Sequence, residues 1–173
     1  MADFEIKDGV CIIPEGTTEI PDWAFDGCNE LNEVVIPASV TQIRSNVFSD
    51  CTALEKIVVE EGNPKYDSRE GCNAVIETST NELIDGCKAT IIPSSVTEIG
   101  YDAFKNCSSL TEITIPDSVK SLGDSTFYNC TNLKSVKLPG SVKSIGEDAF
   151  YNCTSLSEVH ITDIASWCDI SFY

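Results

Sequence analysis

Residues 92–114 read IPSSVTEIGYDAFKNCSSLTEIT, and this stretch decides the fold because close copies of it recur along the chain. The next copies begin at Ile115 and Leu138, which gives a spacing of 23 residues each time (115 − 92 and 138 − 115). Two earlier copies begin at Ile13 and Ile36, again 23 residues apart. A fixed period of this length indicates a solenoid in which repeat units stack on one another.

Each unit contains a short segment with alternating apolar residues. In the third unit Ile113 and Ile115 lie on the same side of an extended chain, which predicts a strand with one buried face. Pro116 follows and ends the strand, because proline has no N–H for a ladder hydrogen bond. One unit cannot bury its apolar face alone, so we expect neighbouring units to stack with parallel strands about 4.8 Å apart.

The second and third units start 56 residues apart (92 − 36), so the chain between them holds extra residues. Residues 74–77 and 82–85 are short apolar stretches around the polar turn 78–81, which predicts a β-hairpin. We expect a single domain over residues 1–173, divided into an N-terminal cap (1–12), repeats 1 and 2 (13–58), a hairpin-bearing elaboration (59–91), repeats 3 to 5 (92–160) and a C-terminal cap or truncated next repeat (161–173).

The last residues carry an apolar pattern of their own. Ile164, Trp167, Ile170 and Phe172 recur at roughly helical spacing. We expect a short helical turn that covers the last unit with these side chains.

The units resemble the BspA-like leucine-rich repeats, which read roughly I-P-x-S-V-x-x-I-G-x-x-A-F-x-x-C-x-x-L-x-x-I. The match is specific over residues 13–58 and 92–160, although Pro21 and Arg44 stand at the glycine position and Val47 at the alanine position. The resemblance implies a leucine-rich-repeat solenoid. We expect stacked parallel short strands, a turn-rich convex side, little helix and one β-hairpin insertion.

Nine cysteines first suggest disulfides or a metal site. Five share one offset of the repeat, so we expect a ladder of inward-pointing free thiols, which act as small apolar residues: Cys28, Cys51, Cys107, Cys130 and Cys153. A bridge between Cys72 and Cys87 across the hairpin stays open as an alternative. No C-x-x-C pair is present, which disfavours a zinc site.

Composition and motifs argue against several classes of function. The net charge of −17, from 28 acids and 11 bases, disfavours nucleic acid and anionic lipid as partners. No apolar run is long enough to insert into a membrane. His160 is the only histidine and has no nucleophile within predicted reach, and the glycines form no phosphate-binding loop. We therefore expect no enzyme activity, no catalytic or metal-binding residues and no cofactor.

The outward strand positions form the candidate binding surface, because they carry whatever specificity a solenoid has. The first column of outward residues is Glu33, Lys56, Glu112, Ser135 and Glu158. The second column is Val35, Val58, Thr114, Lys137 and His160. Their chemistry is mixed, and an ordinary solvated face is the competing interpretation. Val35 and Val58 are the most partner-like pair.

Two functions follow as expectations. The resemblance implies a non-enzymatic protein-binding module of a cell-surface or secreted adhesion protein, which acts as a monomer on a protein partner of unknown identity. The alternative is an intracellular interaction scaffold, favoured by free thiols and by the lack of a signal peptide at Met1. We accordingly expect an extracellular or cell-surface location in the full-length protein, with a cytoplasmic location as the alternative.

Overall fold

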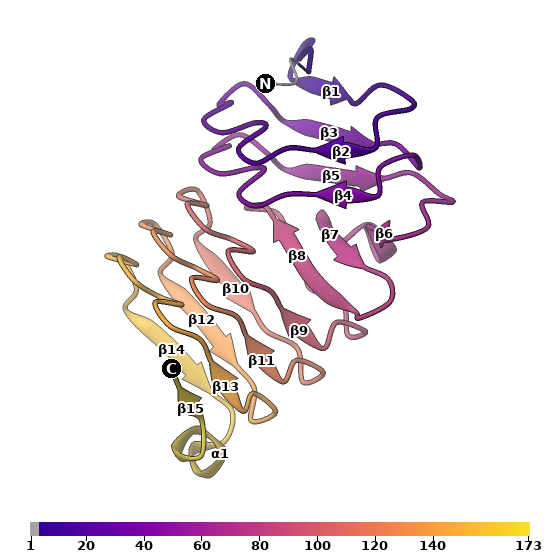
Figure 1. Cartoon of the computed structure of the whole chain (residues 1–173). Helices are drawn as coiled ribbons and strands as arrows, with labels where there is room; N and C mark the ends of the chain where they lie inside the picture. Colours follow the sequence, from indigo (N-terminus) through magenta and orange to yellow (C-terminus); the bar gives the residue numbers. More distant parts are fainter. Residues whose placement is uncertain (1–3) are drawn as a thin grey trace.

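A computed structural model describes residues 4–173, and it confirms the predicted solenoid of stacked parallel strands. Figure 1 shows an elongated stack of turns with the two chain ends at its opposite ends. Helix is limited to the 3-10 turn Arg69–Gly71 and to the five-residue helix α1, Ile164–Cys168. Regular structure therefore comes almost wholly from short strands.

One side of the solenoid carries the strands that the repeat predicts, and we call it the strand face. These strands form two separate parallel sheets, one in each half of the chain. The first sheet contains β1 (Val10–Ile12), β3 (Glu33–Ile36) and β5 (Lys56–Val59). The second contains β10 (Glu112–Thr114), β12 (Ser135–Leu138) and β14 (Glu158–Ile161).

The opposite side carries two-residue strands apart from the hairpin strands β7 and β8, and we call it the short-strand face. A two-stranded sheet joins β2 (Glu19–Ile20) to β4 (Gln42–Ile43). A seven-stranded sheet runs in the order β15-β13-β11-β9-β8-β7-β6. Its strands are β6 (Tyr66–Asp67), β7 (Ala74–Glu77), β8 (Glu82–Gly86), β9 (Glu98–Ile99), β11 (Ser121–Leu122), β13 (Ser144–Ile145) and β15 (Ser171–Phe172).

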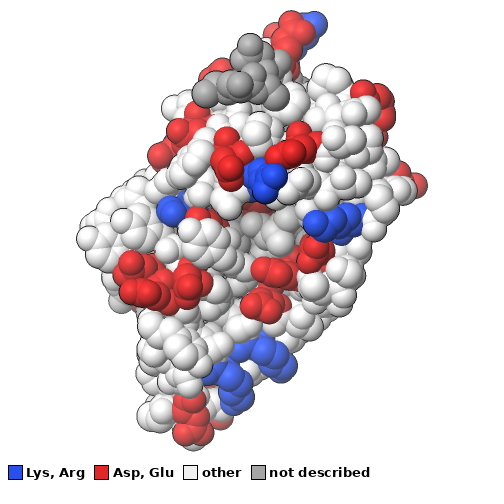
Figure 2. Space-filling model, viewed as in Figure 1, with Lys and Arg blue, Asp and Glu red and all other residues white. Residues whose placement is uncertain are grey.

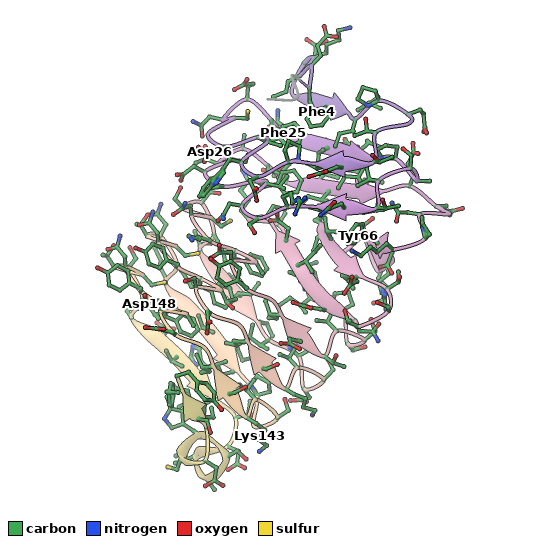
Figure 3. The ribbon with its side chains drawn as sticks, in the orientation of Figure 1. Phe4, Phe25, Asp26, Tyr66, Lys143 and Asp148 are labelled. Carbon is green, nitrogen blue, oxygen red and sulfur yellow. The ribbon has the colours of Figure 1, made fainter. Side chains whose placement is uncertain are left out.

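Between the two faces the inward side chains stack from unit to unit. Phe25 lies between Phe4 and Phe48, with ring centroids 5.3 and 5.7 Å apart, and Figure 3 shows Phe4 above Phe25. A second phenylalanine ladder centres on Phe127, which stacks on Phe104 and Phe150 at 5.2 Å each. The same repeat offset therefore places each ring on its equivalent in the next unit.

The ladder cysteines lie beside these rings and point inward as predicted. Cys51 and Cys130 are buried, and each thiol donates to a phenylalanine carbonyl of the preceding unit, at 2.9 and 3.1 Å. Cys28, Cys107 and Cys153 are only partly buried. All nine cysteines are free thiols, so the alternative of a Cys72–Cys87 bridge is wrong for this structure.

The predicted hairpin is confirmed and forms a wall between two hydrophobic cores. β7 and β8 pair in antiparallel fashion, and β8 continues the parallel sheet through β9. Ala74 and Ile76 of β7 pack into the C-terminal core, whereas Val75 between them packs into the N-terminal core. Burial on both faces explains why β7 is continuously apolar instead of alternating.

We call residues 4–59 the N-terminal block, residues 60–91 the hairpin unit and residues 92–173 the C-terminal block. The hairpin unit separates the strand-face sheets of the two blocks. The turns that follow β4 and β9 bring the two blocks into direct contact. The Asp50 N–H donates to the Asn106 carbonyl at 3.3 Å, and the Asn46 amide donates to the Asp102 carboxylate at 3.1 Å. The hairpin unit therefore separates the two blocks on the strand face, whereas their turns meet on another side. The strands of the two blocks run in different directions in Figure 1.

The C-terminal prediction is right in part. Helix α1 forms, and Trp167 and Ile170 pack against the C-terminal core. Ile164, however, is 74% exposed, and Phe172 is 60% exposed and belongs to β15, which pairs with β13. The apolar spacing predicts one helical turn, but the chain leaves the helix after Cys168 and adds a strand to the short-strand face.

Candidate protein-binding face

In the N-terminal block the predicted outward residues lie in register on neighbouring strands. Glu33 of β3 stands opposite Lys56 of β5, and Val35 stands opposite Val58. The Lys56 ammonium lies 2.7 Å from the Glu33 carboxylate, so this acid and base largely neutralise each other. The two valines are half-buried rather than exposed, because flanking side chains cover part of each one.

The column that contains the valines is longer than the repeat indicated. Ile12 of β1 stands opposite Val35 and is 68% exposed. Ile12, Val35 and Val58 therefore form an apolar column across three neighbouring strands, which we call the apolar column. Sequence reasoning missed Ile12 because residues 1–12 were assigned to a cap, although Ile12 stands 23 residues before Val35 (35 − 12).

The C-terminal block continues both columns with polar side chains. Glu112, Ser135 and Glu158 are in register, as are Thr114, Lys137 and His160, and the repeat predicts both columns. His160 is exposed, and its ring nitrogen lies 3.1 Å from the Glu158 carboxylate.

These polar residues line a hollow of about 460 Å³ on the strand face. Its walls include five of the ten predicted residues, namely Glu112, Thr114, Ser135, Lys137 and His160. Ile91 also lines it and is 75% exposed. Sequence reasoning assigned Ile91 to the hairpin unit and missed it, although it stands 23 residues before Thr114 (114 − 91).

The ten predicted residues do not form one continuous surface. Four belong to the sheet of β3 and β5, six belong to the sheet of β10, β12 and β14, and no strand within residues 4–173 joins these sheets. The hairpin unit separates them, as the break between the second and third repeats predicts, because β7 and β8 belong to the sheet of the short-strand face.

Two of the buried thiols have environments that oppose nucleophilic chemistry. Burial raises the pKa of the Cys11 thiol to about 11, with a smaller contribution from Cys28 nearby. Burial likewise raises the pKa of Cys87 to about 11. A thiol must ionise to attack, so these groups stay unreactive at neutral pH.

Charge on the short-strand face is mixed. Figure 2 shows acidic and basic side chains interspersed over this face, without a patch of a single sign. Within residues 4–173, no three His, Cys, Asp or Glu side chains are placed to hold a metal ion. No helix in that range is long and apolar enough to cross a membrane.

Comparisons with known proteins place this geometry in a family. The first solved structure is a leucine-rich repeat protein of T. pallidum, with 27% identity and a TM-score of 0.57, covering 95% of this chain and 72% of the other. A leucine-rich repeat protein from Eubacterium ventriosum matches with 24% identity and a TM-score of 0.55, over 86% of this chain and 53% of that one.

The pneumococcal vaccine antigen PcpA matches at 24% identity with a TM-score of 0.61, over 75% of this chain and 35% of its own. The chain thus spans about half or less of two of these three proteins, and at 24% identity these two matches show the fold alone. No curated protein matches the chain. The model of the BspA type leucine rich repeat region matches residues 9–73 and 74–173 in six copies, so the chain belongs to the BspA-type leucine-rich-repeat family.

Proposed function

We propose that the chain is a non-enzymatic protein-binding module that contacts its partner through the strand face. The observation that carries this proposal is the apolar column, in which Ile12 is 68% exposed beside Val35 and Val58. One exposed and two half-buried apolar side chains in a row on a sheet are typical of interaction surfaces, because covering them removes the remaining apolar area from water. Membership of a repeat family of interaction modules supports the same function.

The setting that we propose is a cell-surface or secreted protein that adheres to other cells or to host proteins. Its support is the similarity in fold to a pneumococcal protein described as a vaccine antigen. The second candidate is an intracellular interaction scaffold. It is favoured by the nine free thiols, because disulfides form and persist mainly in oxidising compartments.

A binding screen tests the proposal. The protein is screened against extracellular-matrix and cell-surface proteins, and each hit is measured again with the Val35→Lys/Val58→Lys double variant and with His160→Glu. We expect the double variant to weaken binding by about tenfold or more, because two charges replace apolar contacts. Lys120→Glu is the matched control, since Lys120 is exposed and precedes β11 on the short-strand face.

Two outcomes would count against the strand face. Binding that survives the double variant and His160→Glu excludes this face as the contact surface. Binding that Lys120→Glu abolishes assigns the contact to the short-strand face. Folding of each variant is checked by its thermal midpoint, which should stay within a few degrees because the replaced side chains lie on the surface.

A further inference from the structure

β10 is an edge strand although it lies in the middle of the chain. In β3, β5 and β14 the N–H of the first outward residue bonds to a carbonyl of the preceding unit, as when Glu33 donates to Gly9 at 3.0 Å. In β12 the residue just before that position, Lys134, donates to the Thr111 carbonyl at 2.8 Å. Within residues 4–173, neither Thr111 nor Glu112 at the matching positions of β10 donates its N–H to a backbone carbonyl.

The second outward residue of β10, Thr114, also lacks a backbone hydrogen bond to the preceding unit within residues 4–173. In the N-terminal block the Ile13 N–H donates to the Val35 carbonyl at 3.0 Å. The equivalent bond would join Ile92 to Thr114, and it is absent from the described part of the chain. Because backbone groups alternate between the two edges of a parallel strand, those of Glu112 and Thr114 all point to this open edge.

The hairpin unit explains why the edge is open. The segment that precedes β10 in the stack is residues 88–92, and its polar groups bond to the hairpin instead. The Ile91 N–H donates to the Cys72 carbonyl at 3.0 Å, and the Thr90 hydroxyl donates to the Asn73 carbonyl at 2.7 Å. These bonds keep residues 88–92 from pairing with β10 as a neighbouring parallel strand.

Open space reaches this edge. The hollow of about 460 Å³ begins at Thr90, Ile91 and Ile92, passes over β10 and continues along the strand face to β12 and β14. Its volume lies within the range of about 300–1,000 Å³ that is usual for ligand pockets. Ile91 offers an apolar contact that is 75% exposed. Glu112 is exposed and takes part in no ion pair among residues 4–173.

We propose that the open edge of β10 binds an extended segment of a partner protein, which adds a strand to the C-terminal sheet. The backbone donors and acceptors of Glu112 and Thr114 recognise an extended polypeptide. An apolar side chain of that segment packs on Ile91, and a basic side chain lies beside Glu112. Attraction between a basic segment and a chain of net charge −17 favours this pairing. The inference rests on the proposed function as a protein-binding module.

The test uses a displayed library of random heptapeptides selected on the whole protein. Each selected peptide is synthesised, and its affinity is measured for the wild type, for Thr114→Pro and for Ile91→Lys. Proline removes the Thr114 N–H without breaking the bonds of β10 to β12, so the fold should tolerate it at an edge. We expect Thr114→Pro to weaken binding by about three- to tenfold through the loss of one hydrogen bond.

Amide hydrogen exchange supplies a second measurement. We expect a bound peptide to slow exchange at Glu112 and Thr114, while the amides of β3 stay unchanged. Lys137→Pro is the structural control, because its N–H belongs to the register between β12 and β10. This control should lower the thermal midpoint, whereas Thr114→Pro should leave it nearly unchanged. A large loss of stability in Thr114→Pro would overturn the assignment of an open edge.

The remaining outcomes separate this inference from the proposed function. Peptides that bind Thr114→Pro as well as the wild type but fail on Val35→Lys/Val58→Lys overturn the edge proposal and leave strand-face binding intact. A library without any binder at β10 overturns the edge proposal, while the proposed function is decided by the screen against whole proteins. Dimerisation of the free protein that Thr114→Pro abolishes would show that a second copy occupies the edge, and it would overturn the proposed partner segment.

Discussion

The two blocks have the same stacked phenylalanines in their cores and differ in the side chains on their strand faces. In both, equivalent phenylalanines stack about one strand spacing apart. Outward, the same column is apolar in the N-terminal block, from Ile12 to Val58, and polar in the C-terminal block, from Thr114 to His160. The difference teaches that stacking constrains only the residues that meet the next unit. The outward positions are free to vary with function.

A second difference concerns how closely the units approach on the short-strand face. Gly123 in the C-terminal block lies so near the preceding unit that an added Cβ would fall 2.6 Å from the Tyr101 backbone nitrogen. At the equivalent position the N-terminal block has Pro21 and Arg44. The Arg44 side chain instead reaches Glu19 of the preceding unit, at 2.7 Å. The C-terminal units are therefore packed more tightly at this position.

The largest expected effect tests whether the two blocks depend equally on their phenylalanine ladders. Phe25→Ala and Phe127→Ala should each lower the free energy of unfolding by about 3–5 kcal/mol, because both rings are fully buried within a ladder. Urea denaturation of the two variants measures the losses. Equal dependence on the ladders predicts similar values, so a loss in one variant that is several times smaller than in the other would break the comparison.

The next effect tests the closer approach of the C-terminal units. Gly123→Ala should lower the free energy of unfolding by about 1–3 kcal/mol, because the new methyl group meets backbone atoms that cannot move aside freely. Arg44→Ala is the matched variant in the N-terminal block. It should lower the free energy of unfolding much less than Gly123→Ala does, because it removes only an exposed ion pair. Equal losses in the two variants would contradict the difference in packing.

Asp85 of the hairpin wall gives a pH dependence that belongs to the junction of the blocks. Burial raises the pKa of its carboxyl well above the ordinary value of 3.8, and nearby Asp102 adds to the rise. A raised folded-state pKa stabilises the fold below the ordinary value, and this contribution is lost as pH rises through the raised pKa. Asp85→Asn should therefore flatten the fall in stability above about pH 4, as measured by thermal midpoints from pH 3 to 8. An unchanged pH profile would assign that fall to other groups.

The smallest effect concerns the ion pair on the strand face of the N-terminal block. Lys56→Ala should change the free energy of unfolding by less than about 0.5 kcal/mol, because the ammonium is largely solvated and its attraction to Glu33 is screened. Urea denaturation at low and high salt measures the change, which should shrink as salt is added. A larger and salt-independent loss would mean that Lys56 stabilises the block by packing.

Much of the local structure could be predicted from sequence, because it depends on residues close together in the chain. The 23-residue period predicted the inward ladder of cysteines, and the polar turn 78–81 between two apolar stretches indicated the hairpin. The same period contained the signals for Ile12 and Ile91, each 23 residues before a predicted outward residue. Both were missed because the repeat was started at its proline motif, so residues just before that motif were assigned to other segments.

The repeat pattern by itself determined the solenoid, the inward ladders and the register of outward residues within each block. Only the tertiary structure decided that Asp50 meets Asn106 across the long unit, that the hairpin divides the core and that the edge of β10 stays open. These features could not be predicted from the repeat because they depend on contacts between residues that are far apart in the sequence. A period records which side of a strand a residue occupies, whereas the course of 33 extra residues depends on hydrogen bonds and burial between distant parts of the chain.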